Sequence, residues 1–205
     1  MKKMIKICTG MMAGAVLLTG CGSASDAAAD KVVKAYLDVA YGKSVEEYAD
    51  ITGTKKEDAE KYSEQALKAE VDALQAYYGM DTEGSEKTEK AFEEICSLLF
   101  DKAEYNVTAK GDEVTVTFKP VTALESEAVT QYVDDFNVKE FVDGDTSCTD
   151  EAFAEGLLEV LKKDGVEVSD KEETVTVSVS EKDGKKTVSS EELSKIDEAV
   201  LVYED

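Results

Sequence analysis

Thiols and carboxylates are the reactive side chains that this sequence offers, because it contains no histidine and no arginine. There are four cysteines (Cys8, Cys21, Cys96 and Cys148) and 46 acidic residues in a chain of 205. A thiol can accept a lipid, form a disulfide or act as a nucleophile, and paired carboxylates can hydrolyse a glycoside. Without histidine, the usual general base near neutral pH and the commonest metal ligand are missing. We therefore expect no cofactor and no metal, and we assign no catalytic residue.

Cys96 and Cys148 are the two cysteines that could pair within the folded part of the chain. In an oxidising compartment they could form a disulfide. Alternatively, Cys96 lies beside the apolar row of its predicted helix, where a free thiol packs as a small hydrophobic group. A nucleophilic role is disfavoured, because no histidine is present to activate either thiol.

The formal net charge of −23 arises from 46 acidic residues against 23 basic ones, all of them lysines. Binding to nucleic acid requires basic side chains that neutralise phosphates, so we expect no nucleic-acid partner. The charge is most simply a source of solubility. Capture of a cationic partner or of a divalent metal is the alternative.

Glu70 is an acid whose position in the sequence suggests that its carboxyl group could be buried. It lies between Ala66 and Ala73, in a stripe of small residues on a predicted helix. A carboxyl group buried there would have a raised pKa and could meet a ligand. The interpretation that we favour is an acid at the edge of the stripe that pairs with a lysine or reaches solvent.

A second group of polar residues gathers before a predicted helix: Asp143, Asp145, Ser147, Asp150 and Glu151. A calcium loop requires glycine at its sixth position and a carboxylate at its twelfth. Counted from Asp143, these positions hold Cys148 and Ala154, so the calcium pattern fails. We predict that the group forms a turn and caps the following helix.

Tyrosines outnumber phenylalanines by nine to six. Five of them could line a binding pocket: Tyr36, Tyr41, Tyr77, Tyr78 and Tyr132. More often, such residues lie at the edge of the core with the hydroxyl in water.

The first 21 residues have the order of an export signal. Lys2, Lys3 and Lys6 precede a short apolar run, Ile7–Leu18, which is too short to span a bilayer. The run ends in Leu18-Thr19-Gly20-Cys21, which resembles the lipobox of bacterial lipoproteins. The resemblance implies a diacylglycerol on the Cys21 sulfur, cleavage between Gly20 and Cys21, and further acyl chains such as palmitate.

This interpretation divides the chain into three parts. Residues 1–20 are the lipoprotein signal peptide, residues 21–29 are the lipidated cysteine and a short tether, and residues 30–205 are a single extracytoplasmic domain. Removal of residues 1–20 deletes three lysines and no acid, and takes the formal charge from −23 to −26. We expect the protein on the outer face of the cell membrane, held there by its lipid.

The hydrophobic pattern of the domain repeats an order of helices followed by a β-hairpin. Apolar residues at helical spacing predict helices over 30–41, 44–51, 55–78, 85–102, 123–142, 150–163 and from 189 onward. Alternation predicts hairpins over 105–118 and 173–188, the second turning at Asp183-Gly184. Two such halves can form one antiparallel sheet packed by helices, an α+β architecture.

The domain also resembles a family of uncharacterised lipoproteins from Gram-positive bacteria, classed under a domain of unknown function. The resemblance rests on the lipobox and on three stretches: 35–42 (AYLDVAYG), 48–53 (YADITG) and 193–198 (LSKIDE) after the Asp183-Gly184 hairpin. Related lipoproteins often carry cystatin-like or nuclear-transport-factor-2-like α+β domains. The resemblance therefore implies a sheet backed by helices, and it transfers no catalytic residue.

These observations favour a non-enzymatic binding or interaction module at the cell envelope. Its partners would be the membrane, through the lipid, and an envelope protein or a small molecule. The alternative is an accessory cell-envelope hydrolase that uses paired carboxylates. A transporter's capture subunit is a third reading, but a two-lobed clamp usually requires a longer chain. A cleft with two converging carboxylates would indicate the enzyme, and an apolar patch would indicate binding.

Overall fold

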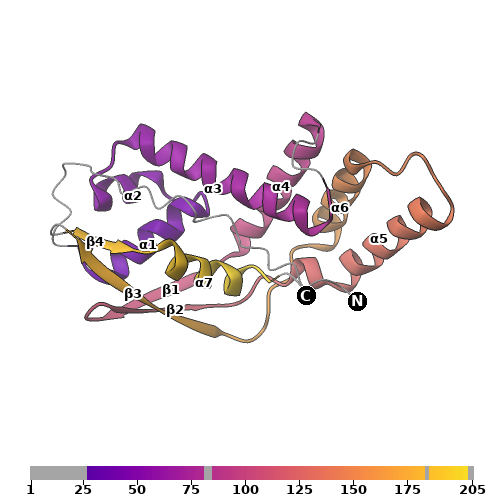
Figure 1. Cartoon of the computed structure of the whole chain (residues 1–205). Coiled ribbons are helices and arrows are strands. Elements are labelled where there is room, and N and C mark those ends of the chain that lie inside the picture. Colours follow the sequence, from indigo (N-terminus) through magenta and orange to yellow (C-terminus); the bar gives the residue numbers. More distant parts are fainter. Residues whose placement is uncertain (1–26, 81–84, 183–184, 203–205) are drawn as a thin grey trace.

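The computed structural model describes residues 27–80, 85–182 and 185–202. Gly20, Cys21, the signal peptide and most of the tether lie outside the described residues, as does the Asp183-Gly184 turn. Within these ranges a layer of helices covers an antiparallel sheet (Figure 1). This arrangement confirms the predicted α+β class and the joining of two hairpins into one sheet.

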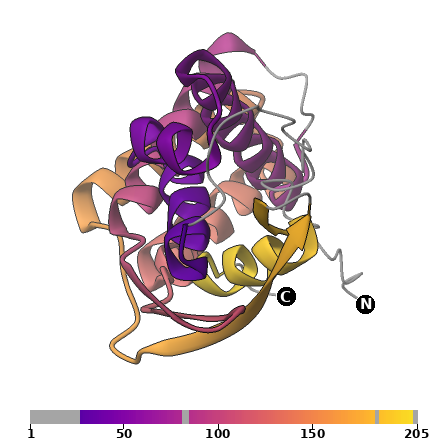
Figure 2. The ribbon, with the colours of Figure 1, turned by 90° about the vertical axis from the view of Figure 1, so that its left-hand side faces the viewer.

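The sheet follows the chain in the order β1-β2-β3-β4, with every neighbouring pair antiparallel. Its strands are Tyr105–Lys110 (β1), Glu113–Phe118 (β2), Glu173–Lys182 (β3) and Lys185–Val188 (β4). The valines at 114, 116, 177 and 179 are buried, while the threonines and serines between them are partly or fully exposed. Alternation therefore places one face of the sheet against the core and leaves the other open. Figure 2 shows the helices gathered on a single side of the strands.

The first half of the chain forms four helices that begin close to their predicted positions. They are Ala29–Ala40 (α1), Val45–Thr52 (α2), Lys56–Tyr77 (α3) and Glu86–Lys102 (α4). Ser44 and Ser85 cap α2 and α4, each accepting a hydrogen bond from the backbone N–H three residues later. The Thr54 hydroxyl accepts a hydrogen bond from Thr52, and α3 begins without a side-chain cap.

The second half differs from the prediction between residues 123 and 142. We expected one helix there, but the chain forms the 3₁₀ turn Ala123–Glu125 (η2), the α-helix Glu127–Asn137 (α5) and the π-helical turn Val138–Val142 (η3). Ser126 causes the first break, because its backbone is extended and its hydroxyl caps α5. The helices Asp150–Asp164 (α6) and Ser190–Val200 (α7) then follow as expected, capped by Thr149 and Ser189.

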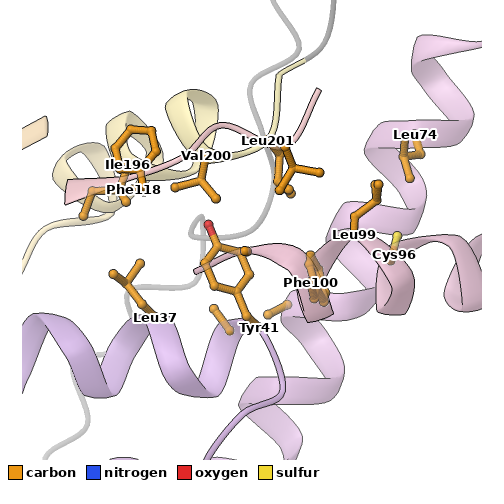
Figure 3. Close-up of a cluster of buried hydrophobic side chains, with 14 of the residues drawn as sticks. Leu37, Tyr41, Leu74, Cys96, Leu99, Phe100, Phe118, Ile196, Val200 and Leu201 are labelled. Atoms are coloured by element: carbon orange, nitrogen blue, oxygen red, sulfur yellow. The ribbon is translucent and has the colours of Figure 1, made fainter. Parts of the chain in front are cut away.

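The core is contiguous and draws on both halves. Figure 3 shows side chains from α1 and α4 that meet Phe118, at the end of β2, and side chains from α7, among them Ile196 and Val200. The end of α7 is also tied to the segment after β2, because the Val121 N–H donates to the Val200 carbonyl at 2.8 Å. A smaller cluster between α1, α2 and α3 contains the buried Tyr48. This packing brings three widely separated helices, α1, α3 and α7, around one interior site.

Candidate functional site

The two cysteines of the described domain are both free thiols. Cys96 is fully buried on α4, and burial raises the pKa of its thiol well above its ordinary value. Cys148 lies in the turn before α6, where desolvation and then Asp145 raise its pKa. The possible Cys96–Cys148 disulfide is therefore not formed, since one sulfur packs in the core as a hydrophobic group. Protonated thiols of this kind are also poor nucleophiles.

Glu70 is the residue whose environment differs most from the interpretation we favoured. Its side chain is completely buried on α3 and does not reach solvent. Burial raises the pKa of Glu70 well above its ordinary value, and the nearby Asp197 raises it further. The small residues Ala66 and Ala73 are buried with it.

Asp197 is the second carboxyl group at this interior site, and sequence reasoning missed it. It lies on α7 with no exposed surface, and its Oδ1 accepts a hydrogen bond of 3.1 Å from the Tyr41 hydroxyl. Figure 3 shows that hydroxyl pointing from α1 toward α7. Burial raises the pKa of Asp197 to about 7, although the bond from Tyr41 acts in the opposite direction. Two like charges cannot both be sustained here, so the pair retains at least one proton near neutral pH.

The interior acid pair is enclosed by the part of the chain that the structure describes. Glu70 and Asp197 are each fully buried, and neither borders the open pocket described below. A catalytic acid must come within hydrogen-bond reach of the group it protonates. The pair is therefore a feature of the core that links α1, α3 and α7.

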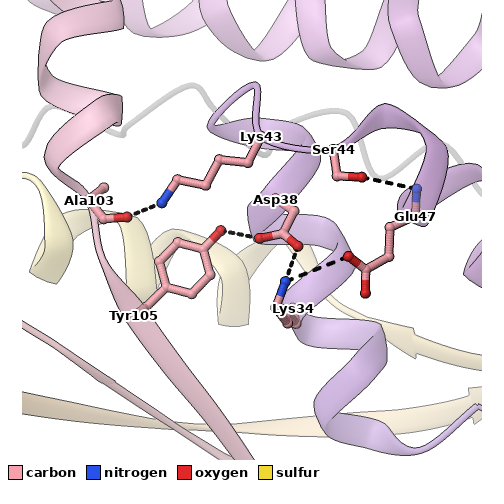
Figure 4. Close-up of polar contacts among 7 residues, drawn as sticks. All are labelled: Lys34, Asp38, Lys43, Ser44, Glu47, Ala103 and Tyr105. Atoms are coloured by element: carbon pink, nitrogen blue, oxygen red, sulfur yellow. Dashed lines mark hydrogen bonds and ion pairs between the residues drawn. The ribbon is translucent and has the colours of Figure 1, made fainter.

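A second polar network surrounds Asp38 at the end of α1 (Figure 4). Its carboxylate accepts a hydrogen bond of 2.6 Å from the Tyr105 hydroxyl of β1 and pairs with Lys34. The ammonium group of Lys43 bonds to the Ala103 carbonyl and lies 4.4 Å from the centre of the Tyr105 ring. Since Asp38 is almost fully buried, these contacts satisfy a carboxylate that the core would otherwise reject. The network joins α1 to the sheet.

One shallow pocket of about 240 Å³ lies where the end of α1 meets α3 and α4. Two exposed carboxylates border it, Glu64 on α3 and Asp101 on α4. The remaining lining residues are Ala40, Tyr41, Gly42, Ser63, Leu67, Ser97 and Phe100. Tyr41 is thus the one predicted pocket tyrosine that borders this pocket.

The other predicted pocket tyrosines have separate surroundings. Tyr36 stacks edge-on against Tyr48 in the small cluster between α1 and α2, with ring centres 5.2 Å apart. Tyr78 and Tyr132 both pack against Phe153 of α6. Tyr77 contacts the ring of Tyr78. The five tyrosines therefore do not form one site, and their rings mostly serve packing between helices.

The acidic group before α6 forms a turn, as predicted. The Oδ1 of Asp145 accepts hydrogen bonds from the backbone N–H and the hydroxyl of Ser147, at 2.9 and 2.8 Å. Thr149, rather than an acid, caps α6. Over residues 27–80, 85–182 and 185–202, no three Cys, Asp or Glu side chains come together in a way that could hold a metal ion.

An apolar patch on η3 is the feature of the surface that stands out. Val138, Phe141 and Val142 are 50%, 76% and 74% exposed, and they are the only large hydrophobic side chains exposed within the described part of the chain. We call these three residues the η3 patch. Sequence analysis assigned them to the end of an amphipathic helix, and the signal that could have found them is the apolar pair Phe141-Val142 directly before Asp143-Gly144.

Backbone hydrogen bonds close the turn that carries the η3 patch. The Asp143 N–H donates to the Val138 carbonyl five residues earlier, which closes the π-turn, and the Asp145 N–H donates to the Lys139 carbonyl. Just before the turn, the Phe136 ring packs edge-on against Phe153 of α6, 5.1 Å away. Short π-helical turns are rare and frequently occur at functional positions.

Comparison with known proteins defines first a fold and then a family. The chain superimposes on the crystal structure of a putative lipoprotein (YcdA) from Bacillus subtilis subsp. subtilis str. 168 with a TM-score of 0.63 and 20% sequence identity. The superposition covers 85% of this chain and 56% of that chain, so this protein spans little more than half of that structure. At this identity the likeness is one of fold.

The family model of a domain of unknown function, DUF5105, matches residues 23–200, so the chain belongs to this family. A search of curated proteins found no match. The resemblance to uncharacterised lipoproteins is thereby supported at the level of family and fold. The cystatin-like and nuclear-transport-factor-2-like part of the expectation is not supported, because it rested on a general α+β arrangement that many folds share.

Proposed function

We propose that the protein is an extracytoplasmic lipoprotein, anchored in the cell membrane through Cys21, whose domain is a non-enzymatic binding module. The lipobox Leu18-Thr19-Gly20-Cys21 supports the anchor, and the structural neighbour with the same fold is itself described as a putative lipoprotein. No helix in the ranges that the structure describes is long and apolar enough to cross a membrane.

The η3 patch is the observation that carries the binding role. Phe141 and Val142 expose about three quarters of their surface, although this chain buries most of its other large apolar side chains. Exposed apolar side chains that gather in one place mark interaction sites, and an aromatic anchor is typical of the energetic centre of an interface. The turn that carries the patch continues directly from α5 and is closed by its own backbone hydrogen bonds, so less order would have to be gained on binding than in an unstructured loop.

The second candidate is the cell-envelope hydrolase, and one specific observation favours it. Glu64 and Asp101 border the same open pocket from different helices, and carboxylate catalysis requires two acids at one cleft. The pocket is shallow, however, and acids at a surface with this charge are common. We therefore rank this candidate below the binding module.

Affinity capture with matched variants tests the proposal. The soluble domain, residues 22–205, is immobilised and exposed to detergent-solubilised envelope, beside a variant that carries Val138→Ser, Phe141→Ser and Val142→Ser. We expect one protein that the native domain retains and the triple variant loses. A Glu64→Gln, Asp101→Asn variant should retain that protein equally well. Equal capture by native domain and triple variant, or turnover of cell-wall glycan that the Glu64→Gln, Asp101→Asn change abolishes, would overturn the binding role.

A further inference from the structure

The charge around the η3 patch is strongly one-sided. Between residues 134 and 145 there are five carboxylates and one lysine, Lys139. The carboxylates are Asp134, Asp135, Glu140, Asp143 and Asp145. Among the described residues none of the five forms an ion pair, although eleven ion pairs form elsewhere on the domain. The η3 patch thus lies in a segment where five carboxylates face a single lysine, a local excess of four negative charges.

We infer that the η3 patch inserts into an apolar recess of an envelope protein whose rim carries lysine and arginine side chains. This inference rests on the proposed binding function and adds the chemistry of the partner. Phe141, the most exposed of the three side chains, provides the anchor, with Val138 and Val142 beside it. The surrounding carboxylates select a basic rim, since opposite potentials accelerate encounter and like charges across an interface are costly.

A lipid surface fits the same patch less well. Bacterial membranes expose anionic headgroups, which the carboxylates of this segment would repel. The position of the patch also disfavours lipid: α5 lies at the right-hand end of the molecule in Figure 1, whereas α1, into which the tether leads, packs against β4 toward the left. Only five residues separate Cys21 from Ala27, a span that reaches about 20 Å at most, so an anchored domain holds its α1 end near the bilayer.

A second copy of the chain fits less well for the same electrostatic reason. Self-association through the η3 patch would bring two sets of these carboxylates together, and the intact domain already carries a large negative charge. Like charges juxtaposed in this way cost free energy unless a cation intervenes. The charge thus favours a different protein over both lipid and self.

Site-specific photo-crosslinking in cells identifies what touches the η3 patch. Benzoylphenylalanine replaces Val142 in the full-length lipoprotein, and a control carries it at Thr108, which is exposed on the edge strand β1. We expect a crosslink to one envelope protein from position 142 and not from position 108. A crosslink to lipid, to a second copy of the chain or to nothing would overturn the inference.

The partner protein identified by the crosslink is then purified and titrated with the domain. This titration tests separately whether the η3 patch binds the partner and whether the rim of the partner is basic. Phe141→Ser should weaken binding at least about tenfold, as expected for an anchor residue. A Glu140→Lys, Asp143→Lys variant should weaken it similarly, and added salt should weaken native binding mainly through a slower association rate. A control with Glu113→Lys and Glu173→Lys on the sheet should bind as the native domain does.

Two results are distinguishable in this titration. Loss of binding in Phe141→Ser without any effect of charge reversal or salt would leave the binding function standing and refute the basic rim. Binding that none of these variants weakens would refute both. Tight association of the native domain with phosphatidylglycerol vesicles, lost in Phe141→Ser, would show that the η3 patch meets lipid.

Discussion

At the scale of single residues, the interior pair of Glu70 and Asp197 is the feature that most affects how stable this domain can be. Two buried carboxyl groups are costly, and they persist here because at least one stays protonated and Tyr41 donates a hydrogen bond to Asp197. Ionisation of either acid should therefore destabilise the packed core. The free energy of unfolding should consequently depend on pH.

We predict that the domain loses stability as pH rises from about 4 to about 7. An unfolded aspartate ionises near pH 3.9, whereas burial raises the pKa of Asp197 to about 7. Between these two pKa values the folded state binds a proton at Asp197 that the unfolded state has released. The resulting contribution to the free energy of unfolding is about 4 kcal/mol below pH 4, and it is lost as the pH rises to 7. Urea unfolding of the native domain between pH 4.5 and 8 measures this slope.

Asp197→Asn should flatten that slope, because an amide keeps the bond from Tyr41 without a charge to desolvate. At pH 8 the variant should be more stable than the native domain by about 2–4 kcal/mol. Glu191→Gln, also on α7 and exposed, removes one charge that does not act on Asp197 and should leave the slope nearly unchanged. A native domain that is as stable at pH 8 as at pH 4.5 would contradict the assignment.

The sequence reveals only half of this pair. The small residues around Glu70 indicate a tightly packed helix face. The hydrophobic periodicity does not indicate which element covers that face. Asp197 lies 127 residues further on and shows no unusual pattern within α7. The pairing depends on α7 closing over α1 and α3, which is a tertiary contact that neither segment encodes alone.

At the scale of elements, helices and hairpins were largely predictable because each carries local information. Ser44, Ser85 and Ser189 have the hydroxyl that caps a helix, and the valines of β2 and β3 alternate strictly. The exception is residues 123–142, where the apolar spacing runs without interruption through Ser126. Whether that serine sits in a helix or caps one depends on contacts made by Val121 with residues near the other end of the chain.

The contact between α5 and α6 supplies a prediction at this scale. A methyl group on Gly156 of α6 would lie 2.3 Å from the hydroxyl oxygen of Tyr132 and 2.7 Å from the adjoining ring carbon. Alanine normally stabilises a helix interior by about 1 kcal/mol over glycine. Here Gly156→Ala should instead destabilise the domain by about 1–3 kcal/mol, because it displaces the ring and breaks its 2.8 Å bond to the Phe153 carbonyl. Thermal or urea unfolding measures whether the substitution lowers or raises the free energy of unfolding.

A second substitution identifies the cause of that loss. In a Tyr132→Ala background the ring is absent, so Gly156→Ala should become neutral or stabilising. The same clash should loosen the support of the η3 patch, since Tyr132 and Phe136 both hold α5 against Phe153. Stabilisation by Gly156→Ala in the native background would show that α5 and α6 are not closely packed at this point.

At the scale of the whole molecule, the proposed function depends on a covalent event at a residue outside the described domain. Lipidation of Cys21 would convert a domain of high negative charge, which anionic headgroups should repel, into a membrane protein. Two acyl chains suffice for stable anchoring, at about 0.8 kcal/mol per buried methylene group. The lipid-attachment site Cys21 and the η3 patch thus lie in different parts of the chain, and a substitution can remove either one without the other.

We predict that Cys21→Ser releases the protein from its anchor. Native protein should fractionate with the membrane at a processed size, having lost residues 1–20, whereas Cys21→Ser should remain unprocessed or appear in the soluble extracytoplasmic fraction. Cys8→Ser is the matched control, because that thiol lies in the apolar run that is removed. Metabolic labelling with palmitate should mark native protein and Cys8→Ser but not Cys21→Ser. If Cys21→Ser kept both the membrane location and the processed size, another segment would hold the domain at the membrane, and the spatial argument for a partner beyond the bilayer would lose its basis.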